Sequence, residues 1–423
     1  MTVAGPFDNA RLLGIADALA IAVALSLPWS TSATVILVIL WALSLIAMFD
    51  LRALRETVMT PAGGLPVLLV LLGALGMAWA DVNAMARLDG ADSYLKLLAI
   101  PLLLIQFQRS ERGLWVLGAF VLSCTVLLVA TALIMLVPPL SEALVRPDNV
   151  IVKNAASQSG EFVLCVFGLA YVAVDAAERR QWRWFAGIAL IMLGMLTSMA
   201  FLSTGRTALV TIPVLLVLFA LKRLSARAAV AVLVGAAVLA AVAWSSAPYL
   251  RDRATAVWTE TQNYLASNAR NSSGERLAFY SYSLRFISEA PVIGHGTGTI
   301  TKLFAEATAG KTGAAGSATT NPHNQSLAVA IQIGLVGALA LWAMWIAHFM
   351  LFRAPGLVQW IGLVVVTQNI VGSLFNSHLF DFLQGWIYVF GVGVAGGLAL
   401  RERRSRVAIA MPHEAPREMA PRL

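Results

Sequence analysis

Long apolar blocks, each about 17–25 residues and so long enough to cross a bilayer, recur along the whole chain between short charged joints. Hydrophobic residues make up 59% of the 423 residues and Asp, Glu, Lys and Arg only 12%, so this chain could not cover a soluble surface. That composition excludes a DNA-binding, a secreted disulfide-rich or a disordered protein. Hydrocarbon offers no partner for a loose backbone N–H or C=O. The sequence therefore predicts an all-α, polytopic membrane protein.

We predict about twelve transmembrane helices from these blocks. They cover residues 11–28, 31–49, 65–80, 94–107, 113–137, 160–176, 184–202, 206–221, 227–246, 323–351, 356–374 and 383–400. The block 94–107 is short for a span and is expected to tilt or to lie beside a thinner region. Cys124 and Cys165 both fall inside predicted spans, so we expect packing residues, with no disulfide and no metal.

Lys and Arg concentrate on one side of the membrane if the N-terminus is placed in the cytoplasm. The formal charge of +8 is then carried by the inner face, so it indicates orientation and not a nucleic-acid partner. The predicted domains are residues 1–246 with nine spans, a large outward loop at 247–322, three spans at 323–400 and a basic cytoplasmic tail at 401–423. Another span follows the first apolar block, so we expect no cleaved signal peptide.

The large outward loop is expected to carry function, because loops this long are rare in a tight bundle. Within it, Glu275 to Glu289 is predicted to form an amphipathic helix that Pro291 ends. The expected apolar stripe is Leu277, Tyr280, Leu284 and Ile287, and the expected cap is Ser272 or Ser273. Neither Gly310-Lys311-Thr312 nor the turn from Gly294 to Gly298 has the spacing or the strand of a nucleotide-binding loop.

Several ionisable residues fall at the outer ends of predicted spans or in the outer loops. A cation such as Arg206 must find an anion or a water-filled cavity there; the alternative is an arginine that snorkels to the headgroups. Arg276 could equally lie on a solvated face of the loop helix. His323 heads an apolar helix, which a capped helix start would also explain, and His378 and Asp381 could form a simple interfacial turn.

Taken together, these residue types could bind a diphosphate and transfer a proton. Forked guanidinium groups such as Arg206 and Arg276 suit a pyrophosphate and could stabilise it as it leaves. A histidine such as His323 can accept a proton from a sugar hydroxyl near neutral pH. The outer segments contain no D-x-D pair and no dense carboxylate or Cys/His cluster, so no metal and no cofactor are indicated.

Two motifs in the second half of the chain carry a family resemblance. The first runs from Gly274-Glu275-Arg276 to the segment PVIGHGTG at 291–298, and the second comprises PHNQSL at 322–327 and QIGLVG at 332–337. Together with the span layout, they resemble the O-antigen ligase/polymerase superfamily, in which an "R…PxxGxGxG" segment precedes an "HNxxL…xxGxxG" helix. The chain departs from that pattern at His295, where the family usually has an apolar residue, and this second histidine could share proton traffic.

The resemblance implies a bacterial inner-membrane glycosyltransferase of the GT-C type, working in lipopolysaccharide biosynthesis with its active site facing the periplasm. Such ligases move O-antigen glycan from undecaprenyl diphosphate to lipid A–core, with inversion and without a metal. The family's functional residues match Arg206, Arg276, His323 and Asp381. We expect the arginines to hold the diphosphate and His323 to orient or deprotonate the acceptor hydroxyl.

The sequence also suggests substrate-binding residues and leaves alternative functions open. Asn324, Gln325 and Asp381 are predicted to bind substrate, the first two by positioning sugars. An O-antigen polymerase shares the motifs and would join lipid-linked repeat units instead; a protein O-glycosyltransferase would use a third acceptor, for which the chain is short. A transporter or flippase would need charged residues deep in the spans, and Asp17 is one possible buried acid.

Overall fold

The computed structural model describes residues 9–146 and 149–410, and in these residues every regular element is a helix. In chain order the elements are α1 (Asn9–Ser26), α2 (Thr31–Ile46), α3 (Leu51–Val58), α4 (Pro61–Gly76), α5 (Ala84–Leu95), η1 (Lys96–Leu98), α6 (Ala99–Arg109), α7 (Gly113–Met135), α8 (Pro138–Leu144), α9 (Ala155–Glu178), α10 (Trp182–Phe201), α11 (Arg206–Arg223), α12 (Ala226–Ser246), α13 (Pro248–Ser267), α14 (Ser272–Glu289), α15 (Ile300–Thr308), η2 (Ala314–Gly316), α16 (Gln325–Leu351), α17 (Leu357–Ser373) and α18 (Phe382–Ala410). The predicted all-α class is confirmed.

Each predicted span overlaps a helix, but not every helix is long and apolar enough to cross a membrane. Within the described residues six helices meet that condition, namely α7, α9, α10, α12, α16 and α18, and the pair α2 and α3, bent by 116°, would make a seventh. The protein is thus a polytopic membrane protein, and the count of twelve spans stays a prediction. Helix α18 runs through Ala410, so the first part of the predicted tail is helical; residues 411–423 lie outside the described residues.

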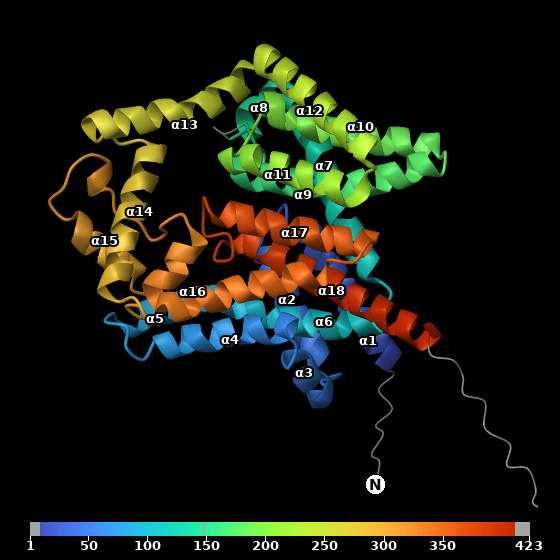
Figure 1. Cartoon of the computed structure of the whole chain (residues 1–423), viewed down its shortest axis with the longest axis horizontal. Helices are drawn as coiled ribbons and strands as arrows, with labels where there is room; N and C mark the ends of the chain where they lie inside the picture. The colour runs from blue at the N-terminus through green and yellow to red at the C-terminus, as the bar shows by residue number, and fades with distance from the viewer. Residues whose placement is uncertain (1–8, 147–148, 411–423) are drawn as a thin grey trace, which may run out of the picture.

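The helices lie side by side in layers, and α13, α14 and α15 of the outward loop gather at one end of the bundle (Figure 1). Helix α18 packs against α6 and α17, and α16 packs against α4 and α14. Phe107, Trp41 and Tyr388 are among the largest fully buried side chains of the resulting core. Because α14 contacts α16 directly, the predicted outward loop has a fixed place at one end of the bundle.

Helix α14 confirms the predicted amphipathic helix but corrects its details. The cap is Asn271, whose side chain accepts from the Gly274 N–H, and not Ser272 or Ser273. The predicted stripe is wrong for Leu277 and Leu284, which are 37% and 62% exposed, whereas Ile287 does pack against the buried aromatic residues. The buried face comprises Ser273, Gly274, Ala278, Phe279, Ser283 and Phe286. Leu277–Leu284 and Phe279–Phe286 share the same seven-residue spacing, and packing of the larger rings against Phe304 decides between them.

A turn at residues 294–298 ties the outer loop to α4 and α5. The Thr297 N–H donates to the Gly76 carbonyl at 3.0 Å, and its hydroxyl donates to the Gly73 carbonyl at 2.7 Å. Gly298 has φ of +93°, and a Cβ at this position would overlap the carbonyl oxygen of Ala86. The glycine therefore provides both the left-handed backbone and the close approach to α5.

Gly298→Ala is expected to lower the free energy of unfolding by about 2 kcal/mol or more, because it adds a backbone clash to a strained φ. Thermal unfolding in detergent measures the change. Gly310→Ala is the matched control: Gly310 also has positive φ, +71°, but a Cβ there meets nothing within 4 Å, so about 1 kcal/mol is expected. If both variants lost the same free energy of unfolding, the close approach of Gly298 to α5 would not be what requires glycine there.

Candidate functional site

The N-terminal ends of α11, α14 and α16 and the loop 374–381 bring the predicted ionisable residues together. Arg276 on α14 interacts electrostatically with Arg206, the first residue of α11, and with His323, which precedes α16. It also lies close enough to His378 to act on its charge. Three residues from distant parts of the sequence thus converge at one site, although the sequence alone permitted a separate explanation for each.

Arg206 is held by an acidic residue of the outer loop. Its guanidinium binds Glu260 of α13 through two bonds, Nη1 to Oε2 at 2.9 Å and Nη2 to Oε1 at 2.5 Å, and Nη1 also reaches Ser273 Oγ at 3.2 Å. Burial pushes the pKa of Glu260 upward, but the hydrogen bonds from Arg206 and Ser273 hold it below its usual value. Because the Arg206 side chain is only 16% exposed, the alternative of a snorkelling arginine does not describe it.

Arg276 differs from Arg206 in having its donors unused. It is half-buried, and in the described part of the chain no side chain or carbonyl forms a hydrogen bond or ion pair with it. Burial lowers the pKa of Arg276, and the positive charge of Arg206 lowers it further. An arginine remains protonated at neutral pH even so. Two guanidinium groups side by side, one of them without a partner, make a site suited to an anion with several oxygens.

His323 sits in a strained backbone position. Its φ is +55°, a left-handed value that non-glycine residues seldom adopt. Its N–H donates to Asn321 Oδ1 at 2.8 Å, its carbonyl accepts from the Tyr280 hydroxyl at 3.1 Å, and its ring stacks on Phe279 with the planes 20° apart. Burial lowers the pKa of His323, against the effect of the hydrogen bond that its ring donates to Asn376, which raises it. The imidazole is therefore neutral at pH 7, and strain of this kind is typical of functional sites.

A hydrogen-bonded chain fixes the proton on that imidazole. His323 Nδ1 lies 2.9 Å from Asn376 Oδ1, which also accepts from Asn321 Nδ2 at 3.1 Å. Asn376 Nδ2 donates to Asp381 Oδ2 at 2.5 Å. Because the Asn376 oxygen is the acceptor, Nδ1 carries the hydrogen and Nε2 keeps its lone pair. Burial raises the pKa of Asp381 to about 6, so its carboxyl is largely ionised at neutral pH.

Asn324 and Gln325 hold the loop 374–381 against α16. The Asn324 side chain caps α16 by accepting from the Leu327 N–H at 3.1 Å and donates to the Leu374 carbonyl at 3.2 Å. Gln325 is fully buried, and its Oε1 accepts from the Leu379 and Phe380 N–H groups at 2.9 and 3.3 Å. These bonds give both residues a structural role, and their contact with sugars stays a prediction.

The sequence analysis did not identify Glu260 or Asn376. The suggestion that His295 shares proton transfer stays a prediction. Nothing near Glu260 or Asn376 in the sequence marks them, because their partners lie 54 and 53 residues away. His295 Nε2 lies 2.8 Å from the Phe286 carbonyl, so this histidine joins the turn to α14. Among the described residues, no three or more His, Cys, Asp or Glu side chains are grouped where they could hold a metal ion.

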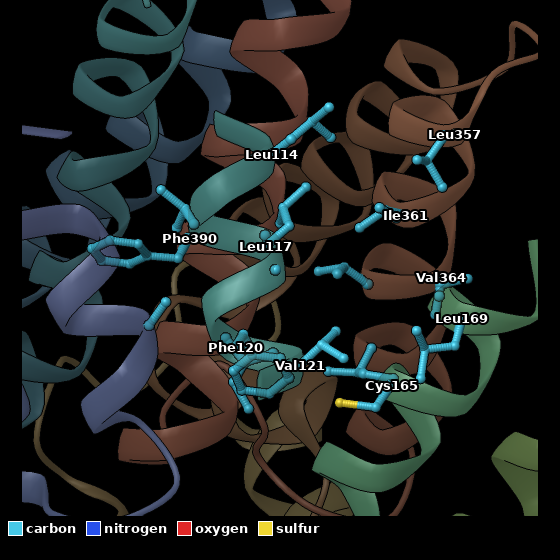
Figure 2. Close-up of a pocket in the computed structure, with 18 of the residues that line it drawn as sticks. Leu114, Leu117, Phe120, Val121, Cys165, Leu169, Leu357, Ile361, Val364 and Phe390 are labelled. Carbon is cyan, nitrogen blue, oxygen red and sulfur yellow. The ribbon is translucent and has the colours of Figure 1, made fainter. Parts of the chain in front are cut away.

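An apolar cavity of about 330 Å³ lies deeper in the bundle, between α1, α7, α9, α17 and α18. Figure 2 shows Leu117 and Val121 of α7 on one side of it and Ile361 of α17 on the other, with Cys165 of α9 at one end. Cys124 and Cys165 are both free and buried. Cys165 follows Ser159 by six residues, about 9 Å along a helix, and Ser159 Oγ accepts from the N–H of Gly205 beside Arg206. The cavity thus begins below the arginine site.

Comparison with known families gives one match. Residues 192–342 match a family model described as O-antigen ligase. The matched segment contains Arg206, Glu260, Arg276 and His323, while Asn376 and Asp381 follow it in the sequence. Among curated proteins, no match was found.

Proposed function

Because residues 192–342 place this chain in the O-antigen ligase superfamily, we propose that it transfers O-antigen glycan from undecaprenyl diphosphate to lipid A–core at the periplasmic face of the bacterial inner membrane. The observation that carries the proposal is the convergence of two arginines, one with unused donors, and a neutral histidine at one end of a membrane-embedded bundle. The reaction is an inverting, metal-independent transfer of the GT-C type.

The diphosphate of the donor binds between the two guanidinium groups. Arg276 offers a free fork, while Arg206 is shared with Glu260, so an incoming diphosphate competes with that carboxylate for the second arginine. As the bond between the anomeric carbon and the diphosphate oxygen breaks, negative charge grows on the leaving group. The fixed positive charges of the arginines stabilise this growing negative charge, and the site does not have to rearrange as the reaction proceeds.

His323 acts on the acceptor. With Nδ1 donating to Asn376, Nε2 accepts the proton of the acceptor hydroxyl, and the oxygen attacks the anomeric carbon from the side opposite the diphosphate. The electron pair of the broken bond leaves with undecaprenyl diphosphate, and the imidazolium then returns its proton to water. Attack from the opposite side accounts for inversion. General base catalysis of this kind contributes about 10²–10⁴-fold to rate.

The first isoprene units of the donor tail enter the apolar cavity of Figure 2, and the rest of the chain lies in the bilayer. The cavity lining is almost wholly aliphatic and aromatic, and Cys165 at one end of it lies about 9 Å along α9 from Ser159, which bonds the N–H of Gly205 beside Arg206. A lipid whose diphosphate lies at Arg206 and Arg276 extends its chain in that direction, into the bilayer. The proposal gives this open apolar space a function.

Reconstitution with a purified lipid-linked glycan tests the function. Lipid A–core and a second lipid-linked glycan are offered together as acceptors, and the products are separated by size and by lipid. Glycan on lipid A–core supports a ligase. Glycan joined to the second lipid-linked glycan would instead make the protein a polymerase, the alternative that the same family covers, and no transfer to either would contradict both.

Transport is the less favoured alternative because the two buried acids of the spans, Asp17 and Glu161, already interact with neighbouring side chains. Asp17 accepts from Gln106 Nε2 at 2.9 Å and from the Ser110 hydroxyl at 2.7 Å. Glu161, which the sequence reasoning did not single out, is buried in α9 and interacts with Lys153 just before that helix. Neither arrangement forms a series of ionisable groups across the membrane.

Asn376 is expected to position His323, and opposite pH shifts test that role. Asn376→Ala removes a hydrogen bond that raises the pKa of His323, so the acid limb of the rate profile moves to lower pH and kcat falls at least about tenfold. Asn376→Asp places a carboxylate beside the imidazole and moves the limb to higher pH. The measurement is kcat for glycan transfer from pH 5 to 8. An acid limb that stays in place in both variants would contradict the role.

A further inference from the structure

Lys96 is a cation within the predicted span 94–107, where a charged side chain requires a partner. It is the first residue of η1, and its Nζ donates to the carbonyl oxygens of Phe380 and Asp381, both at 3.1 Å. The side chain passes over Gly385 of α18, where a Cβ would lie 2.8 Å from its Cδ and 2.9 Å from its Nζ. Glycine at this position thus leaves room for Lys96, and the ammonium group holds the loop between α17 and α18.

The backbone beside Lys96 is held by Tyr94, whose side chain is fully buried. The Tyr94 ring packs edge-on against Phe380 with the centroids 4.8 Å apart, and it lies against Gly73 of α4, where a Cβ would come within 2.9 Å of the ring. One short segment therefore contacts the loop between α17 and α18 twice, through an aromatic ring and through an ammonium group. The position of Lys96 relative to Asp381 is thus fixed by packing.

The carboxyl group of Asp381 links Lys96 to the candidate base. Asn376 Nδ2 donates to Asp381 Oδ2 at 2.5 Å, and Asn376 Oδ1 lies 2.9 Å from His323 Nδ1. Burial raises the pKa of Asp381 to about 6, while the positive charge of Lys96 acts to lower it. The carboxyl is therefore largely ionised at neutral pH. Because an ionised carboxylate has only acceptor oxygens, the Asn376 amide turns its N–H groups toward it and its oxygen toward His323.

We propose that Lys96 is a positioning residue that determines which ring nitrogen of His323 carries the hydrogen. It acts through the charge of Asp381 and the orientation of the Asn376 amide. Without the lysine charge, a protonated carboxyl would donate to the amide oxygen, the amide would turn over, and its N–H would donate to Nδ1 of the imidazole. Asn321 Nδ2 also donates to Asn376 Oδ1, at 3.1 Å, but a bond between neutral groups is the weaker of the two. The inference rests on the proposed function, in which Nε2 is the base.

Other charged groups act on the two ends of this chain. Asp92, which is exposed on α5, interacts electrostatically with Lys96, and Arg276 and Glu275 of α14 interact with His323. The two residues of α14 have opposite charges, so one disfavours and the other favours a second proton on the imidazole. They influence whether the ring is charged, whereas the hydrogen bond at Nδ1 decides which nitrogen carries the hydrogen of the neutral ring.

The ring ¹⁵N chemical shifts of histidine-labelled protein in lipid bilayers test the assignment, because they differ between the two neutral forms of imidazole. The variant His323→Asn identifies the signal of His323 among the five histidines. Lys96→Met removes the charge with little change in volume, and Lys96→Gln removes it but keeps a donor for the two carbonyls. In both variants at pH 7, the hydrogen of His323 is expected on Nε2 instead of Nδ1. In transfer assays kcat is expected to fall at least about tenfold, while the KM for each substrate changes less than about twofold.

Lys302→Met is the matched control. Lys302 also holds a main-chain carbonyl and a carboxylate at this end of the bundle, with Nζ 3.0 Å from the Asp81 carbonyl oxygen and 2.6 Å from Asp81 Oδ2. Among the described residues no hydrogen bond joins Asp81 to Asn376. A displaced hydrogen in both Lys96 variants and not in Lys302→Met supports the assignment even if glycan transfer is never observed. A hydrogen that stays on Nδ1 in either Lys96 variant, or the same change in Lys302→Met, would overturn it whatever the transfer assay shows.

Discussion

Replacing His323 by alanine is expected to remove glycan transfer while the protein still folds in the membrane. In the proposed mechanism the imidazole is the base, held by the hydrogen bond from Nδ1 to Asn376, and its loss would lower the rate by about 10²–10⁴-fold. Because φ at this position is +55°, His323→Asn is the companion variant: asparagine tolerates the left-handed region but is no base. Both variants are assayed in nanodiscs with lipid-linked glycan and lipid A–core.

The matched control for this prediction is His295→Gln. His295 lies in the same outer region, but its Nε2 is bonded to the Phe286 carbonyl, so we expect transfer to remain near that of the unaltered protein. Thermal unfolding of each variant shows whether the fold is intact. Near-normal long-chain lipopolysaccharide in cells that carry His323→Ala would remove the assigned role, because a base that contributes this much cannot be dispensed with.

The helices could be predicted from the sequence because the signal for them is local. A long apolar run must satisfy its backbone hydrogen bonds within itself, so each predicted span overlaps a helix whatever surrounds it. The buried face of α14 could not be predicted in the same way. Leu277 and Leu284 repeat with the same spacing as Phe279 and Phe286, and only the position of Phe304 on α15 decides which pair is buried.

In the candidate site, too, some residues could be predicted from the sequence around them, while others depend on contacts between distant segments. Arg206 and His323 could be predicted because arginine and histidine are unusual at the ends of apolar helices, and Arg276 could be predicted because it lies in a recognisable motif. Glu260 and Asn376 carry no such mark: acids and amides are common in loops, and their roles arise only when distant segments meet. Local pattern therefore located the reactive groups, while their hydrogen-bond partners depend on tertiary structure.

Arg276→Lys is expected to reduce kcat on the order of 10²–10³-fold, although the charge is kept. The Arg276 fork has no partner in the described residues, whereas Arg206 already holds Glu260, so most of the available donors belong to Arg276. A lysine supplies a point charge and loses the paired bonds to the diphosphate oxygens. It is also more readily neutralised than arginine in a half-buried site beside Arg206.

A second arginine on the same helix separates loss of the fork from disturbance of α14. Arg285 is about half exposed and pairs with Glu289 at 3.4 Å, an interaction of little energetic weight at a surface, so Arg285→Lys is expected to leave kcat and KM unchanged. If Arg276→Lys retained full activity under the same conditions, a bidentate grip on the diphosphate would be excluded. Arg206 would then have to release Glu260 to bind the donor, and Glu260→Gln, which weakens that pair, would be expected to lower the KM for lipid-linked glycan.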